Sequence, residues 1–73
     1  MKTKRERFET IAAKRVQRVI NDLESLSKCS NKNNYEYNKA DVNKMITVIR
    51  KKLKAVEELY NQKLNNLKND FKF

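Results

Sequence analysis

The sequence contains no glycine, proline, histidine or tryptophan, and its only cysteine is Cys29. Without histidine and with one cysteine, the chain can form neither an internal disulfide nor a Cys/His zinc site. A chain of 73 residues buries only about 60% of its unfolded surface. Small domains therefore rely on disulfides, metals or partner chains, and self-association is the route left open here.

The sequence contains almost none of the residue patterns that enzymes use for catalysis. It offers no imidazole to activate Cys29, no Gly-rich phosphate loop and no carboxylate pair framed by other polar groups. Cys29 lies at the expected end of a helix, where the helix dipole disfavours a thiolate, so we interpret it as unreactive. We expect a protein that is not an enzyme and that uses no cofactor, metal or small-molecule substrate.

Long apolar runs are also missing. The basic start of the chain is followed by Ile11, Ala12 and Ala13, which Lys14 interrupts, so neither a signal peptide nor a membrane span is predicted. A single thiol fits a reducing compartment, and we expect a cytoplasmic protein.

What the sequence has in excess is positive charge, with 18 Lys and Arg against 9 acidic residues and a formal net charge of +9. A field of this sign attracts polyanions, which are nucleic acids or anionic membrane surfaces. An alternative origin of the composition is a low-GC genome, because Lys and Asn have AT-rich codons. The apolar positions carry Val, Ile, Leu and Ala rather than interfacial Trp, which favours helix packing over a membrane partner.

A first amphipathic helix is predicted over about residues 4–28. Thr3 and Glu6 form the T-x-x-E pattern of a capping box, which places the helix start at Lys4. Apolar residues then recur every three or four positions on one stripe, which ends at Leu26. The stripe contains Phe8, Ala12, Val16, Val19, Leu23 and Leu26, with Ile20 beside it.

A second helix is predicted over about residues 39–69. Asn38 can cap the amide of Asp41, and Tyr37 with Val42 can form a hydrophobic staple. The apolar stripe here is wider than that of the first helix. It contains Val42, Ile46, Ile49, Leu53, Val56, Tyr60, Leu64, Leu67 and Phe71, with Met45, Val48 and Leu59 to one side.

These elements predict one all-α domain over residues 1–73, an antiparallel two-helix hairpin with a loop over residues 29–38. In this Gly-free loop we expect an Asn to adopt the left-handed conformation, at one of Asn31, Asn33 and Asn34. The second helix, about 46 Å long, overhangs the first, about 37 Å long. Its end either frays or packs on a second copy, and we favour a homodimeric four-helix arrangement. The residues beyond the first helix are Leu64, Leu67, Phe71 and Phe73.

Basic residues cluster on one flank of the first helix and on one side of the second. A ridge of long cations is suited to contacting phosphates without reading bases. The alternative is a solvated face whose cations pair in part with Glu9, Asp22, Glu57 and Glu58. The residues expected to contact nucleic acid are Lys4, Arg5, Arg7, Lys14, Arg15, Arg18, Arg50, Lys51 and Lys54.

The loop carries two tyrosines, Tyr35 and Tyr37, which can stack on bases, anchor a protein partner or simply close the end of the hairpin. Tyr37 has the structural explanation given above. The loop residues without one form a candidate partner-binding site, Lys32, Asn33, Asn34 and Tyr35.

The segment C-S-N-K-N-N-Y-E-Y, followed by K-A-D-V-N-K-M and preceded by R-F-E-T-I-A-A-K-R-V, resembles a group of small proteins. These proteins are encoded on plasmids and conjugative elements of low-GC Gram-positive bacteria. The resemblance covers about residues 4–57, and it implies a mobile genetic element as the setting without implying an activity.

We therefore expect a small, basic, non-enzymatic accessory protein of a mobile element that binds DNA mainly through phosphate contacts. The alternative is a protein-interaction module, such as an inhibitor or assembly factor, that docks a larger protein through the loop or the second helix. Neither a DNA sequence nor the identity of a partner follows from these residues.

Overall fold

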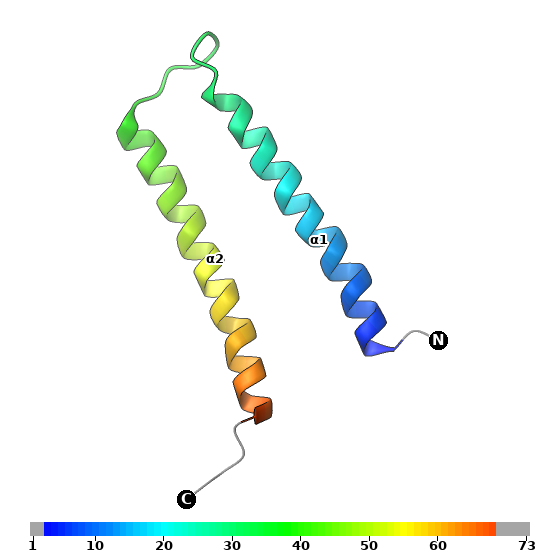
Figure 1. Ribbon diagram of the computed structural model, residues 1–73. Coiled ribbons are helices and arrows are strands. Elements are labelled where there is room, and N and C mark those ends of the chain that lie inside the picture. Colours follow the sequence, from blue (N-terminus) through cyan, green and yellow to red (C-terminus); the bar gives the residue numbers. More distant parts are fainter. Residues whose placement is uncertain (1–2, 69–73) are drawn as a thin grey trace, which may run out of the picture. The chain divides into compact units, whose positions relative to one another are not determined.

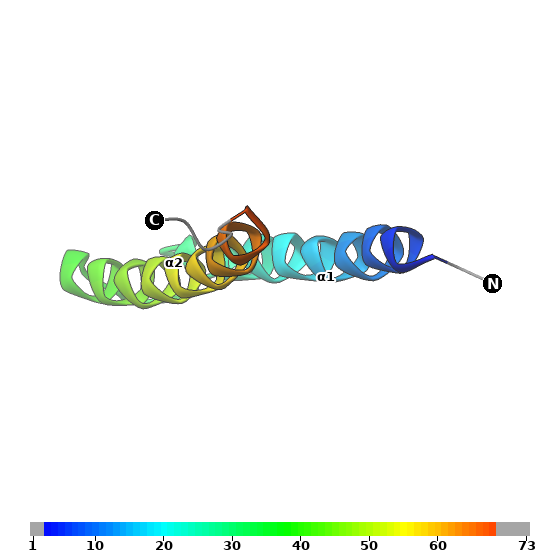
Figure 2. The same cartoon turned by 90° about the horizontal axis from the view of Figure 1, so that it is seen from below.

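The protein is all-α in the computed structural model, which describes residues 3–68 and the side chains of residues 3–65 (Figure 1). The elements are α1 (Lys4–Ser27), a short 3-10 helix η1 (Lys28–Ser30) and α2 (Lys39–Lys68), and the described residues contain no strand. Both α-helices are unbroken coils when viewed from a second direction (Figure 2). The predicted all-α class and the two predicted helices are confirmed.

The chain divides into two compact units, residues 1–36 and residues 37–73. Each unit is built on one α-helix. The antiparallel hairpin and its homodimer stay predictions.

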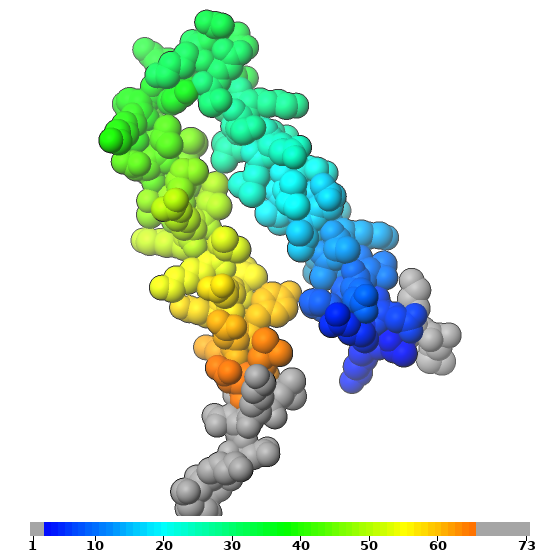
Figure 3. Space-filling view, viewed as in Figure 1, coloured from blue at the N-terminus to red at the C-terminus, as the bar shows by residue number. Residues whose placement is uncertain are grey.

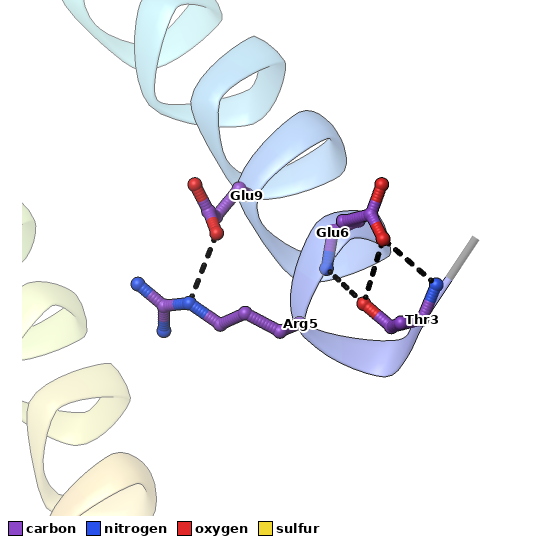
Figure 4. A network of polar contacts seen from close by, with 4 residues as sticks. All are labelled: Thr3, Arg5, Glu6 and Glu9. Atoms are coloured by element: carbon purple, nitrogen blue, oxygen red, sulfur yellow. Dashed lines mark hydrogen bonds and ion pairs between the residues drawn. The ribbon is translucent and has the colours of Figure 1, made fainter.

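A capping box fixes the start of α1 at the predicted residue (Figure 4). The backbone amide of Glu6 donates to Thr3 Oγ1 at 3.1 Å, and the amide of Thr3 donates to Glu6 Oε1 at 3.4 Å. The amide of Arg7 donates to the Thr3 carbonyl at 3.0 Å. The exchange between Thr3 and Glu6, three apart in sequence, thus satisfies amide donors that the helix start would otherwise leave unpaired, and the Arg7 bond is the first of the helix ladder.

The end of α1 differs slightly from the prediction. The α-helix stops at Ser27 rather than Lys28, and Lys28–Ser30 continue as the tighter η1. Ser27 Oγ donates to the Glu24 carbonyl at 2.6 Å, so a hydroxyl competes for a carbonyl of the last turn. A short 3-10 turn is a common way for an α-helix to end once its apolar stripe has stopped.

The loop after η1 turns around Asn31. Its side-chain Oδ1 accepts from the amide of Asn33 at 2.9 Å, and its carbonyl accepts from the amides of Asn34 and Tyr35 at 3.1 and 3.0 Å. No described residue has a positive φ, so the expected left-handed Asn is wrong. The side chain and the carbonyl of Asn31 together hold the turn, which removes the need for that conformation.

Helix α2 begins with a reciprocal cap of the same kind as that of α1. The amide of Asp41 donates to Asn38 Oδ1 at 2.9 Å, and the amide of Asn38 donates to Asp41 Oδ2 at 3.0 Å. The predicted cap is confirmed. Tyr37 and Val42 are half-buried, as a staple between them requires, but the staple contact itself stays a prediction.

The description of α2 ends at Lys68, one residue before the predicted end. Asn69, Phe71 and Phe73 lie outside the described residues, and Leu67 lies outside the described side chains. Of the residues predicted to extend beyond the first helix, only Leu64 has a described side chain, and that side chain is exposed.

The apolar sides of the helices are open to solvent. Among the described side chains none is buried, and Ala12, Leu26, Tyr37 and Val42 alone are half-buried. Side chains stand out from the axis of each helix along its length (Figure 3). Each helix therefore presents an amphipathic surface, whose apolar side is available for packing.

Candidate nucleic-acid interface

Five cations share one side of α1, which we call the α1 basic flank. At about 100° of rotation per residue they fall within an arc of about 100°, beside the apolar stripe. All are exposed. The members of the flank are Lys4, Arg7, Lys14, Arg15 and Arg18.

The α1 basic flank has two groups along the helix axis. The interval from Arg7 to Lys14 corresponds to about 10 Å at a rise of about 1.5 Å per residue. Asp22 follows on the same arc about one turn beyond Arg18, so the flank ends there. The result is a positively charged ridge about 20 Å long, suited to contacting several phosphates at once.

Arg5 is placed differently from the other α1 candidates. Its Nε lies 3.0 Å from Glu9 Oε1 (Figure 4). Its guanidinium carbon lies 5.8 Å from the centroid of the Phe8 ring. Its position is about 100° around the helix from Lys4, on the apolar side. Arg5 therefore lies outside the flank, and its exposed pair with Glu9 is weak.

The cations predicted on α2 form a smaller group in the other unit of the chain. Arg50 and Lys54 lie about 40° apart around the helix, and Lys51 lies about 60° from Lys54. All three are exposed. The structure thus brings Arg50 and Lys54 onto one side and leaves Lys51 at its edge.

The alternative reading of the charges, a solvated face neutralised by acidic neighbours, holds for one pair. Glu9 pairs with Arg5. Within residues 3–65, Asp22, Glu57 and Glu58 form no ion pair with a described residue, and neither do the members of the α1 basic flank. The flank is therefore free to bind an external anion.

The candidate loop site is ordered by a residue that the sequence reasoning left out. Asn33, Asn34 and Tyr35 donate their amides to Asn31, and the Tyr35 side chain is 52% exposed. Lys32 lies in the same turn and has an interaction of its own. The role of Asn31 could have been predicted from the sequence, because an Asn two residues before a turn position is typical of an Asx turn.

Other kinds of site find little support in the part of the chain that the structure describes. It contains no group of three or more metal-ligating side chains. Neither helix, over its described length, combines the length and hydrophobicity needed to cross a bilayer. Cys29 is an exposed free thiol.

Comparison with protein-family models, with curated proteins and with solved structures gave no match to this chain. The resemblance to plasmid-encoded proteins therefore stays a prediction from the loop segment, and the function has to be argued from the site alone.

Proposed function

We propose that the protein is a small, basic, non-enzymatic accessory protein that binds DNA, mainly through contacts of the α1 basic flank with phosphates. The observation that carries this proposal is the exposure of five cations on one arc of α1 without ion-pair partners among the described residues. Cations of this kind displace the counterions condensed on a duplex, which drives association without reading bases.

The local structure supports this use of α1. The capping box at Thr3 keeps the first turn helical, so Lys4 and Arg7 stay in phase with the cations that follow. On α2, Arg50, Lys51 and Lys54 add positive charge. We place the protein in the cytoplasm of a bacterium carrying a mobile element, on the basis of the loop resemblance and the single thiol.

The proposal includes the assembly predicted from the sequence, an antiparallel hairpin that pairs into a homodimer. Both α1 and α2 carry an exposed apolar surface, and that of α2 is wider. Contiguous apolar surfaces that run along a helix are rarely left in water. A homodimer would present two copies of the α1 basic flank to one duplex.

Fluorescence anisotropy with a labelled duplex of mixed sequence tests DNA binding. Five phosphate contacts per chain predict that log Kobs falls with log salt concentration at a slope of about −4.5. Duplexes of unrelated sequence should bind with similar affinity, because phosphates carry no sequence information. Absence of binding to duplex and to single strands at low salt would contradict the proposal.

A protein-interaction module is the second candidate, and the exposed Tyr35 on an ordered turn favours it. Exposed aromatic residues commonly anchor protein interfaces. Pull-down from host lysate with and without nuclease separates the two functions. Recovery that nuclease abolishes indicates DNA, whereas a discrete protein band that survives nuclease and is lost with Tyr35→Ala indicates the module.

A further inference from the structure

Helix α2 has two apolar sides, only one of which α1 can match. The first, the α2 seam, occupies an arc of about 80°. The α2 second side is centred about 100° around the helix from the seam. The α2 seam consists of Val42, Ile46, Ile49, Leu53, Val56, Tyr60 and Leu64, and the α2 second side consists of Met45, Val48, Ala55 and Leu59.

The α2 second side is strongly exposed. Val48 is 62%, Leu59 58% and Met45 41% exposed, the same range as the exposed members of the seam, which run from 36% at Ile46 to 67% at Leu53. Because α1 carries a single stripe about 80° wide, packing it on the seam would leave the second side in water. An apolar surface of this extent is typical of an interface with another chain.

We propose that this other chain is a second copy of the protein, with the two α2 helices antiparallel about a two-fold axis between Leu53 and Lys54. The inference rests on the homodimer of the proposed function, which it makes specific, and not on DNA binding. The α2 seam stays available to α1 in each copy.

The positions of the apolar residues fit a self-complementary interface. Val48 and Leu59 are centred between Leu53 and Lys54, which puts the two-fold axis there. An antiparallel pair with this centre overlaps along the 30 described residues of α2, Lys39–Lys68, a length of about 45 Å. Two-fold symmetry then makes Val48 of each copy meet Leu59 of the other.

The remaining positions of the α2 second side agree with the same register. Ala55 of one copy faces Lys52 of the other, and the small alanine leaves room for the lysine stem to lie along the interface with its ammonium in water. At one edge of the contact, Ile49 lies opposite Val56 of the second copy, which extends the apolar area.

Charges at the opposite edge identify the partner as another copy of this chain. Lys51 and Glu58 lie on that edge, about 20° apart around the helix. In the antiparallel register each Lys51 faces Glu58 of the other copy, which gives two equivalent ion pairs. Within the described residues neither side chain has a partner in its own chain. A parallel pair would instead place Lys51 and Glu58 of one copy beside the apolar edge of the other, formed by Ile49 and Val56, and would form neither ion pair. Because Lys51 pairs with Glu58 of the other copy, Arg50 and Lys54 are the predicted α2 residues that can still contact phosphates.

Sedimentation equilibrium of the full chain at low salt, with circular dichroism at the same concentrations, tests the arrangement through charge reversal. Lys51→Glu and Glu58→Lys should each raise the dimer dissociation constant about 5- to 30-fold, because each turns both ion pairs into pairs of like charges. The double variant, Lys51→Glu with Glu58→Lys, should return to within about twofold of the wild type, since it restores both pairs in reverse.

The matched controls are the neighbouring residues on the far side of α2. Arg50→Glu and Glu57→Lys make the same charge changes about 100° away from Lys51 and Glu58, and they should alter the dissociation constant less than threefold. Val48→Lys should abolish the dimer. If this variant also loses helicity, the charge-reversal series decides, because its positions are exposed at the edge.

A wild-type chain that is monomeric and helical at high micromolar concentration would overturn the inference. So would single reversals no stronger than their controls, or a double variant that stays as weak as the singles. None of these results would alter the salt dependence of DNA binding by a monomer, so failure of this interface and failure of the proposed function are distinguishable.

Discussion

At the scale of single residues, the two helix starts are built in the same way. Thr3 with Glu6 and Asn38 with Asp41 each exchange hydrogen bonds between side chain and backbone across three residues. In a chain without glycine or proline these pairs replace the usual signals that set where a helix begins. The acidic member of each pair also lies in the first turn, where the helix dipole favours negative charge.

Removing the second cap should destabilise α2 measurably. Asn38→Ala is expected to cost about 1 kcal/mol of unfolding free energy, since an orphan amide loses its acceptor. Urea denaturation followed by circular dichroism gives the value. Asn43→Ala is the control, because Asn43 is an exposed position inside α2 where alanine favours the helix. Equal effects of the two substitutions would show that the cap contributes nothing.

Sequence reasoning found both caps because each depends on two residue types at a fixed short spacing. It named Asn31 only as a candidate for the left-handed conformation, and missed that its side chain and its carbonyl hold the loop turn. The same residue type serves left-handed positions and Asx turns, and the choice between them is a matter of backbone geometry that composition does not determine.

At the scale of the helices, the proposed DNA binding depends on the angular positions of the cations around α1. The cations of the α1 basic flank form a ridge only because α1 continues for 24 residues without a break. A helix places residues three and four apart on one side, so a local sequence pattern becomes a surface about 20 Å long. The apolar stripe beside it fixes which side of α1 faces a packing partner.

Neutralising part of this ridge should weaken DNA binding in a way that depends on position. The triple variant Arg7→Gln, Arg15→Gln and Arg18→Gln should reduce the magnitude of the salt slope by about 2.7, because three phosphate contacts are lost. Glutamine keeps a helix propensity close to that of arginine, so α1 should persist. Titrations of labelled duplex at several salt concentrations give the slope.

A second triple variant controls for net charge. Lys28→Gln, Lys44→Gln and Lys63→Gln remove the same charge at exposed positions away from the flank. This control should change the slope by less than one unit. If both triple variants lower affinity equally, the overall field rather than the α1 basic flank binds the DNA.

The start of each helix was predicted to the residue, and the end of α1 to within one residue. The exception at Ser27 arises from competition between a hydroxyl and the helix ladder, a local effect that periodicity does not report. The basic flank was also predictable, except for Arg5, whose pairing with Glu9 and proximity to Phe8 become visible only in three dimensions.

At the scale of the whole molecule, the composition of the apolar positions limits what a sequence can specify. Val, Ile and Leu show which side of each helix is apolar, but they are nearly interchangeable as packing partners. Which surface covers which is decided by register and by charges at the edges, as with Lys51 and Glu58. The fold class was therefore predictable, whereas helix pairing depends on relations between distant residues.

The exposed thiol of Cys29 allows the helix pairing to be measured without any substitution in the sequence. As the only cysteine, it accepts one nitroxide label per chain. In the antiparallel pair, the starts of the two α2 helices are about 45 Å apart, and each label is attached ten residues before such a start. Electron dipolar spectroscopy should then give a long distance, well above 30 Å, whereas a parallel pair would bring the two labels close together.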